Sequence, residues 1–167
     1  MQQSIRYAWG DSSLGRFIAA SSERGLVMVE FADADALPMQ ALRLRFPDAD
    51  LVEAPEAMAQ TVAELSRLID HPQLNSTLAL DLRGSEFELR VWQALREIPA
   101  GQTLSYGTIA ARLGAPGMAR EVGAACAANT LAVIVPCHRV LKKDGSLSGY
   151  RWGVKRKRAL LEQEARA

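Results

Sequence analysis

The chain has 167 residues, of which 49% are apolar and 23% charged. This length and composition are typical of one compact globular unit, or of two small subdomains that share a core, and they exclude a disordered or fibrous protein. No apolar run approaches the roughly 20 residues that a membrane span needs, and residues 1–10 lack the charged-then-apolar layout of a signal peptide. We therefore expect a cytoplasmic protein that does not associate with membranes.

The chain has only two cysteines, Cys126 and Cys137, which are too few for a disulfide framework. Together with His71 and His138 they do not form the paired CxxC pattern that is typical of a zinc site, so we expect no metal. A free thiol with a chemical role is compatible with this cysteine usage.

Charge is distributed unevenly along the chain, although the formal net charge is only +1. Residues 1–85 contain 7 Lys/Arg and 12 Asp/Glu, a net charge of −5, whereas residues 86–167 contain 13 and 7, a net charge of +6. A basic surface neutralises phosphates and releases counterions, so the second half is the candidate for binding nucleic acid. Ordinary solvated helix faces would give the same composition.

The first half is predicted to be a small α/β subdomain, residues 1–83. Short apolar or alternating runs separated by turn residues predict an antiparallel meander. Helical spacing of apolar residues predicts helices over 34–46 and 55–69. An apolar run at 78–82 predicts a strand that leads to a domain junction at Gly84. The expected strands of the meander cover residues 5–9, 15–20 and 26–31.

The second half, residues 84–167, is predicted to be mainly helical. Ser85 is placed to cap a helix that ends at Pro99, and Ser105 is placed to cap a short helix over 106–113. A glycine-containing turn and a second helix over 118–128 follow, which is the arrangement of a helix-turn-helix. Small residues on this second helix would allow close approach to DNA, although tight helix packing explains them equally well. These residues are Ala119, Gly123, Ala124, Ala127 and Ala128.

A buried apolar run at 131–135 leads to Pro136, Cys137 and His138. A thiolate is a strong nucleophile, and a cysteine needs a neighbouring base or positive charge to ionise near neutral pH. The alternative is a cysteine that only fills the core, since free cysteine is among the most buried residue types.

The segment Asn129–Val140, with the sequence NTLAVIVPCHRV, resembles the active-site signature of the O6-alkylguanine-DNA alkyltransferases. The resemblance extends through Ser146–Gly153 and back through Val91–Arg96 and Ser105–Tyr106. More weakly, Ile5–Ala8 with Leu14–Arg16 resembles the N-terminal half of the same family, especially the C-terminal alkyltransferase domain of bacterial Ada proteins. Two cysteines cannot supply the four thiolates of the Ada metal-binding domain, so we expect a self-standing repair domain or an excised one.

This resemblance implies a ribonuclease H-like N-terminal subdomain followed by a winged helix-like DNA-binding domain. Cys137 matches the alkyl acceptor, and His138 would act as its base through a water molecule. Glu164 would orient the imidazole and stabilise its cationic form, unless it is an ordinary solvent-facing charge. Asn129 would bind main chain on both sides of the reactive turn, unless it is an ordinary helix cap.

The resemblance also implies contacts to the damaged base. The hydroxyl of Tyr106 would donate to N3 of guanine, unless this tyrosine only belongs to the core. The carbonyls of Cys137 and Val140 would accept from the exocyclic amine, and the main-chain N–H of Arg151 would contact O6. Arg120 would enter the base stack where the guanine leaves, unless it contacts phosphate. The implied DNA- and base-binding residues are Arg120, Ala119, Tyr106, Val140, Arg151 and Ser148.

The implied reaction is stoichiometric transfer of a methyl or larger alkyl group to Cys137 from O6-alkylguanine, with O4-alkylthymine as a second candidate substrate. The product is a thioether, which is a poor leaving group, so each molecule would act once. The expected partner is double-stranded DNA carrying the lesion, bound in its minor groove by a monomer without a cofactor. The basic run 155–158 is expected to contact phosphate or to form a solvated helix face, with a targeting signal as a third alternative.

Two other classes of function remain open at this point. A non-catalytic lesion-binding or regulatory helix-turn-helix protein is the first, but the alkyltransferase-like proteins of that kind lack the acceptor that Cys137 supplies. A Cys-His hydrolase is the second, although no oxyanion-hole loop is recognisable and the DNA-side features would have no explanation.

Overall fold

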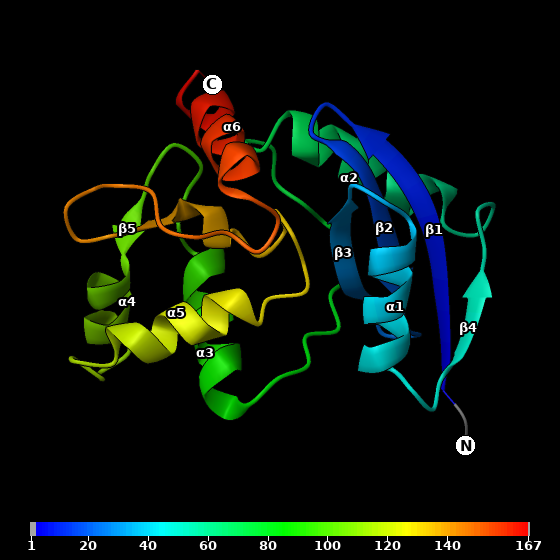
Figure 1. The fold of residues 1–167 in the computed structure, drawn as a ribbon, viewed down its shortest axis with the longest axis horizontal. Coiled ribbons are helices and arrows are strands. Elements are labelled where there is room, and N and C mark those ends of the chain that lie inside the picture. The colour runs from blue at the N-terminus through cyan, green and yellow to red at the C-terminus, as the bar shows by residue number, and fades with distance from the viewer. Residues whose placement is uncertain (1–2, 167) are drawn as a thin grey trace.

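The computed structural model describes residues 3–166. A four-stranded sheet occupies one half of the molecule and a mainly helical part the other, as Figure 1 shows. The sheet has the order β3-β2-β1-β4, and its first three strands form the antiparallel meander that the sequence predicts. The fourth strand, parallel to β1, was not predicted, because none of its four residues is buried and its pattern carries no signal. The strands are β1 (Ser4–Ser12), β2 (Gly15–Ser21), β3 (Leu26–Ala32) and β4 (Asp50–Glu53).

Two helices cover opposite faces of this sheet, close to the positions that helical spacing predicts. Helix α1 (Ala36–Arg45) packs on the face that contains Ile18, and α2 (Ala59–Asp70) packs on the face that contains Phe17. Alternate residues of β2 point to the two faces of the sheet, so neighbouring side chains enter different cores. The core on the α2 face continues into the helical half, for example through Leu95, so the two halves share a hydrophobic core.

Strand β3 lies at the edge of the sheet, yet all seven of its residues are buried. The N–H of Val29 donates to the carbonyl of Thr130 at 2.8 Å, and the N–H of Ala132 donates to Val29 at 3.0 Å. Main chain from the second half therefore covers the edge and satisfies its polar groups.

The prediction of a strand at residues 78–82 is wrong. Only Leu80 forms a β-bridge, to Leu26, although two hydrogen bonds hold this extended segment against the start of β3. The segment around Thr130 pairs with the next residues of the β3 edge, so the pairing between residues 78–82 and β3 cannot extend into a regular strand.

The helical half contains α3 (Glu86–Arg96), α4 (Tyr106–Arg112), α5 (Ala119–Ala127) and α6 (Val154–Ala165). Ser85 and Ser105 cap α3 and α4 as the sequence predicts. Helix α3 packs against α5, and the indole N–H of Trp92 donates to the carbonyl of Ala125 at 2.9 Å. No helix within residues 3–166 is long and apolar enough to cross a membrane.

A two-stranded parallel sheet links the start of α4 to the segment that carries Cys137. Its strands are β5 (Leu104–Ser105) and β6 (Val140–Leu141). Because β5 ends directly before Tyr106 and β6 begins three residues after Cys137, this short sheet brings the phenol and the thiol to one pocket.

The capping box at the start of α3 gives a test of this fold. The Ser85 hydroxyl accepts from the N–H of Glu88 at 3.1 Å, and the Glu88 carboxylate accepts from the N–H of Ser85 at 2.8 Å. Ser85→Ala should lower the free energy of unfolding by about 1 kcal/mol in urea denaturation, because an N–H of the first turn loses its partner. Ser85→Asp keeps an acceptor and should retain most of that stability. Equal losses in both variants would contradict a capping role.

Candidate active site

Cys137 begins a short 3-10 turn, Cys137–Arg139 (η1), and only 5% of its surface is exposed. The run at 131–135 is largely buried, as expected, but it forms turns rather than a regular element. Its centre is Val133, whose φ of 69° lies in the left-handed region that a β-branched residue rarely adopts. Such a backbone costs on the order of 1–3 kcal/mol and persists only where its surroundings hold it.

The side chain of Asn129 holds this turn. Its Oδ1 accepts from the N–H of Leu131 at 2.9 Å, and its Nδ2 donates to the carbonyl of Val135 at 3.0 Å. The same Nδ2 lies 3.4 Å from the sulfur of Cys137. One buried amide therefore ties both sides of the turn and donates toward the thiol, which is more than a helix cap does.

His138 and Glu164 meet in the interior, where they are 0% and 3% exposed. Their Nε2 and Oε1 atoms lie 2.6 Å apart, and Arg139 holds the same carboxylate, with Nη2 2.8 Å from Oε1. The alternative of a solvent-facing Glu164 is therefore wrong. Arg139 had no role assigned from the sequence, although it lies within the matched motif.

The ionisation of this pair follows from its surroundings. Burial disfavours the Glu164 carboxylate, but the hydrogen bonds from His138 and Arg139 outweigh burial and hold the pKa of Glu164 below its ordinary value. Burial lowers the pKa of His138, although Glu164 acts to raise it. The neutral imidazole then donates Nε2–H to Glu164, and Nδ1, which has no partner within residues 3–166, is the ring atom that can take a proton.

The surroundings of both cysteines favour the protonated thiol over the thiolate. Burial raises the pKa of the Cys137 thiol, and the hydrogen bond from Asn129 and the charges of Lys157 and Arg151 only oppose that rise. Burial also raises the pKa of Cys126, to about 12. A reaction at Cys137 therefore needs a base to remove the proton.

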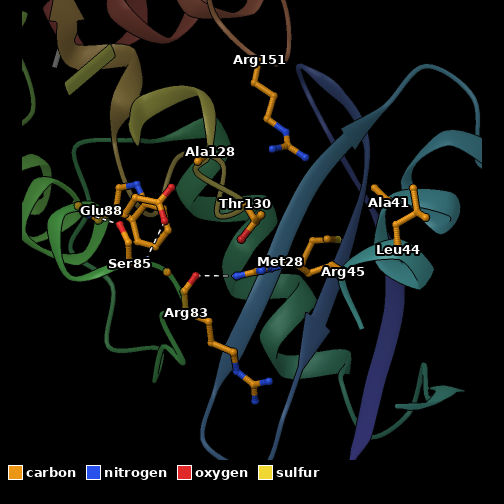
Figure 2. A pocket seen from close by; sticks show the side chains of 12 residues that line it. Met28, Ala41, Leu44, Arg45, Arg83, Ser85, Glu88, Ala128, Thr130 and Arg151 are labelled. Atoms are coloured by element: carbon orange, nitrogen blue, oxygen red, sulfur yellow. Dashed lines mark hydrogen bonds between the residues drawn. The ribbon is translucent and has the colours of Figure 1, made fainter. Parts of the chain in front are cut away.

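A pocket of about 310 Å³ opens onto Cys137. The hydroxyl of Tyr106, on one wall, lies 2.5 Å from Ser148 Oγ. The largest hollow described, about 760 Å³, lies elsewhere, between the two halves (Figure 2), and is lined by neither Cys137 nor His138. The smaller pocket is lined by Tyr106, Gly123, Cys126, Ala127, Cys137, Gly149, Tyr150 and Arg151.

Arg151 connects the rim of this pocket to the sheet. Its Nη2 lies 2.5 Å from the Oε1 of Glu30 on β3, and its Nη1 donates to the carbonyl of Ala127 at 3.4 Å. Figure 2 shows the side chain extending from its loop toward β3. The sequence suggested only a main-chain role for Arg151, and this side-chain contact depends on a strand far away in the sequence.

The outer face of α5 carries small residues. Val122, Ala125 and Cys126 form its buried face, whereas Ala124 and Ala127 are exposed. Tight helix packing therefore does not explain these two alanines. Arg120 and Glu121 are exposed in the first turn, and Ala119, Gly123 and Ala128 are half-buried.

The basic run 155–158 is not a uniformly solvated face. Lys157 is 0% exposed, and its Nζ donates to the carbonyl of Val140 at 2.7 Å and to Ser148 Oγ at 2.8 Å. Arg156 donates to the carbonyl of Leu14 at 2.9 Å. The surface prediction is therefore wrong for Lys157, whereas Arg156 is half-buried. Helical spacing carried the signal, because Lys157 lies three and seven residues before Leu160 and Glu164, both buried.

The neutral, buried state of His138 predicts a pH dependence of stability. The folded chain binds a proton at His138 less readily than the unfolded chain does, so the free energy of unfolding should fall as the pH drops below about 6.5. A single proton gives a slope of at most about 1.4 kcal/mol per pH unit. Urea denaturation between about pH 5 and 7 should show this slope reduced in His138→Asn and retained in His71→Asn, whose histidine is exposed. The same slope in both variants would contradict the assignment.

Comparisons with known proteins identify relatives of this chain. Residues 86–166 match the family described as 6-O-methylguanine DNA methyltransferase, DNA binding domain. The inducible methylated-DNA--protein-cysteine methyltransferase of Bacillus subtilis is 41% identical over 90% of this chain and 85% of its own length. The crystal structure of Mycobacterium tuberculosis OGT in complex with DNA has a TM-score of 0.81 and 38% identity, covering 96% of this chain and 93% of that one.

The bifunctional transcriptional activator/DNA repair enzyme Ada of Escherichia coli is 48% identical over 96% of this chain. The chain spans 46% of the length of that relative, whereas it spans most of the Bacillus subtilis protein. Identity at this level over nearly the whole chain shows that the chain belongs to the family of methylated-DNA--protein-cysteine methyltransferases.

Proposed function

We propose that this chain repairs DNA by moving the alkyl group of an O6-alkylguanine onto Cys137, irreversibly and once per molecule. The observation that carries this proposal is Cys137 at a pocket of about 310 Å³, next in sequence to a buried imidazole whose Nδ1 has no partner among the described residues. The family membership supports the same reaction.

The reaction starts with the Cys137 thiol, because its pKa is raised by burial. Nδ1 of His138 takes the thiol proton through a water molecule, and Glu164 and its contact to Nε2 stabilise the imidazolium that forms. The sulfur then attacks the alkyl carbon in line with the bond to O6. A carbon–sulfur bond forms, the carbon–oxygen bond breaks, and its electron pair stays on guanine.

The pocket then stabilises the departing guanine. Tyr106 donates to N3, where negative charge develops, and the Arg151 N–H donates to O6. The carbonyls of Cys137 and Val140 accept from the exocyclic amine and select guanine. The guanine recovers a proton from the imidazolium or from solvent, and the thioether on Cys137 remains because thiolate is a poor leaving group from carbon.

Helix α5 is the second helix of a helix-turn-helix, and its outer face binds DNA in the minor groove. The exposed Ala124 and Ala127 let the helix approach closely, and the structure of Mycobacterium tuberculosis OGT with DNA supports DNA as the partner. Cys137 is nearly buried, so the target base must leave the duplex to reach it. Arg120, in the first turn of α5, occupies the place that the flipped base leaves in the base stack.

The finer structural assignments belong to the same proposal. The first half, residues 1–83, corresponds to a ribonuclease H-like subdomain, and residues 84–167 correspond to a winged helix-like domain. The chain acts as a monomer, and O4-alkylthymine is a second possible substrate. A protein that only binds the lesion would not need a thiol with a hydrogen-bond donor and a histidine beside it. The surroundings of Cys137 therefore argue against that alternative.

The acceptor is tested by intact-protein mass after incubation with duplex DNA that contains O6-methylguanine. The wild-type chain should gain one methyl group, and Cys137→Ala should gain none while it still binds DNA. Cys126→Ala is the matched control and should keep transfer, since the Asn129 amide donates toward the sulfur of Cys137 and His138 is next to Cys137 in sequence. Methyl mass on Cys126 in the wild-type chain would overturn the assignment.

Base flipping is tested with Arg120→Ala. Unstacking a base costs a few kcal/mol and is needed only in duplex DNA, so this variant should slow repair of the duplex much more than benzyl transfer from free O6-benzylguanine. Single-turnover rates on both substrates measure the difference. Equal losses on the two substrates would rule out a role in flipping.

A further inference from the structure

Glu30 is a buried carboxylate in the sheet half that the reaction described above does not use. It lies on β3 and is 6% exposed. Within residues 3–166 its one ion pair is with Arg151, with Oε1 and Nη2 2.5 Å apart. Burial raises the pKa of Glu30, and the charge of Arg151 opposes that rise. A buried carboxylate is costly unless it is paired, so Glu30 depends on Arg151 for its place on an otherwise apolar strand.

Arg151 lies in the loop 145–153, which forms one wall of the active-site pocket. Glycines with positive φ stand at both ends of this loop, Gly145 at 84° and Gly153 at 98°. The N–H groups of residues 147–152 donate to no main-chain carbonyl within residues 3–166. The loop therefore depends on side-chain contacts for its shape, and the N–H of Arg151 is available to an atom in the pocket.

The guanidinium group of Arg151 ties this loop to two other elements. Its Nη2 contacts Glu30 on β3, and its Nη1 donates to the carbonyl of Ala127 at 3.4 Å, at the C-terminal end of α5 (Figure 2). The carbonyl end of a helix favours a cation, but this contact is long. The contact to Glu30 is much shorter and joins opposite charges. Glu30 is therefore the group that holds the guanidinium, and with it the wall of the pocket.

We propose that Glu30 is a positioning residue for alkyl transfer: by holding the Arg151 guanidinium against β3, it fixes the Arg151 main-chain N–H at O6 of the substrate. This role rests on the proposed function, because O6 gains negative charge as the carbon–oxygen bond breaks. A donor that is already in place stabilises this charge without reorganisation, so it favours the transition state over the bound substrate. Glu30 does not line the pocket and acts only through Arg151.

The test compares benzyl transfer from O6-benzylguanine with transfer from S6-benzyl-6-thioguanine, in which sulfur replaces O6. Sulfur is a weak acceptor, so the Arg151 N–H contributes mainly to the reaction of the oxygen compound. Glu30→Leu should lower the ratio of the two single-turnover rates, oxygen over sulfur, roughly tenfold, the size of one hydrogen bond lost in the transition state. Intact-protein mass over a wide range of times gives both rates. Free bases are used because an unpaired guanidinium also binds DNA phosphate.

Asp81 provides a matched control. It forms an ion pair with Arg83 at 2.8 Å, and the side-chain exposures of this pair, 9% and 33%, nearly equal the 8% and 32% of Glu30 and Arg151. Asp81 does not line the active-site pocket. Asp81→Leu should therefore leave an arginine unpaired in the same way and keep the wild-type ratio. A reduced ratio in Asp81→Leu would assign the effect to lost stability and overturn the proposal.

The pairing also predicts that two substitutions are not additive. Arg151→Met keeps the main-chain N–H but loses the guanidinium, so it should lower the ratio as Glu30→Leu does, and the double variant should lower it no further. The double variant leaves no unpaired charge and carries the test if a single variant does not fold. Equal slowing on both compounds, with a wild-type ratio, would overturn the proposal. A wild-type chain that takes no benzyl group from O6-benzylguanine would instead overturn the proposed function itself.

Discussion

The geometry of the active site depends on the side-chain amide of Asn129. The chain between α5 and Cys137 is neither helix nor strand, and it passes through the left-handed backbone of Val133. Such a segment would not keep one shape without outside contacts. Asn129 supplies them by bonding Leu131 and Val135 and by donating toward the sulfur, so the shape of the turn and the position of the thiol have one cause.

The same segment is anchored to the other half of the molecule. Val29 on β3 exchanges hydrogen bonds with the main chain at Thr130 and Ala132, and Glu30 beside it contacts Arg151 at the rim of the pocket. The sheet contributes no reactive group, but it supports both edges of the site. This explains why a half that showed no catalytic residue in its sequence is built into the same core as the helices.

Two of the four buried ionisable groups behind the site come from helix α6. Lys157 and Glu164 lie seven residues apart on the inner face of α6, and Arg139 and His138 complete the set. Each is buried, so removing one partner would leave another charge or dipole uncompensated. The docking of α6 therefore fixes the polar surroundings of Cys137, His138 and Tyr106 together.

Local patterns in the sequence account for what could be predicted. The helix caps at Ser85 and Ser105 and the meander follow from neighbouring residues, and the Cys137 motif was found through its resemblance to a family. What failed depended on distant contacts: the edge of β3 decided that residues 78–82 form no strand, and Val140 and Ser148 decided that Lys157 is buried. From composition alone, a run of basic residues is predicted to lie on the surface. Only the position of each residue on the helix indicates which of these side chains points inward.

The contrast between the two cysteines shows what makes one of them the candidate acceptor. Both line the same pocket, and they are 5% and 8% exposed, so access does not distinguish Cys137 from Cys126. Burial raises the pKa of both thiols. Only Cys137 has the Asn129 amide as a donor to its sulfur and a histidine next to it in sequence. A donor stabilises the thiolate and a base removes the proton, so reactivity at this pocket is set by the groups that support each sulfur rather than by its exposure.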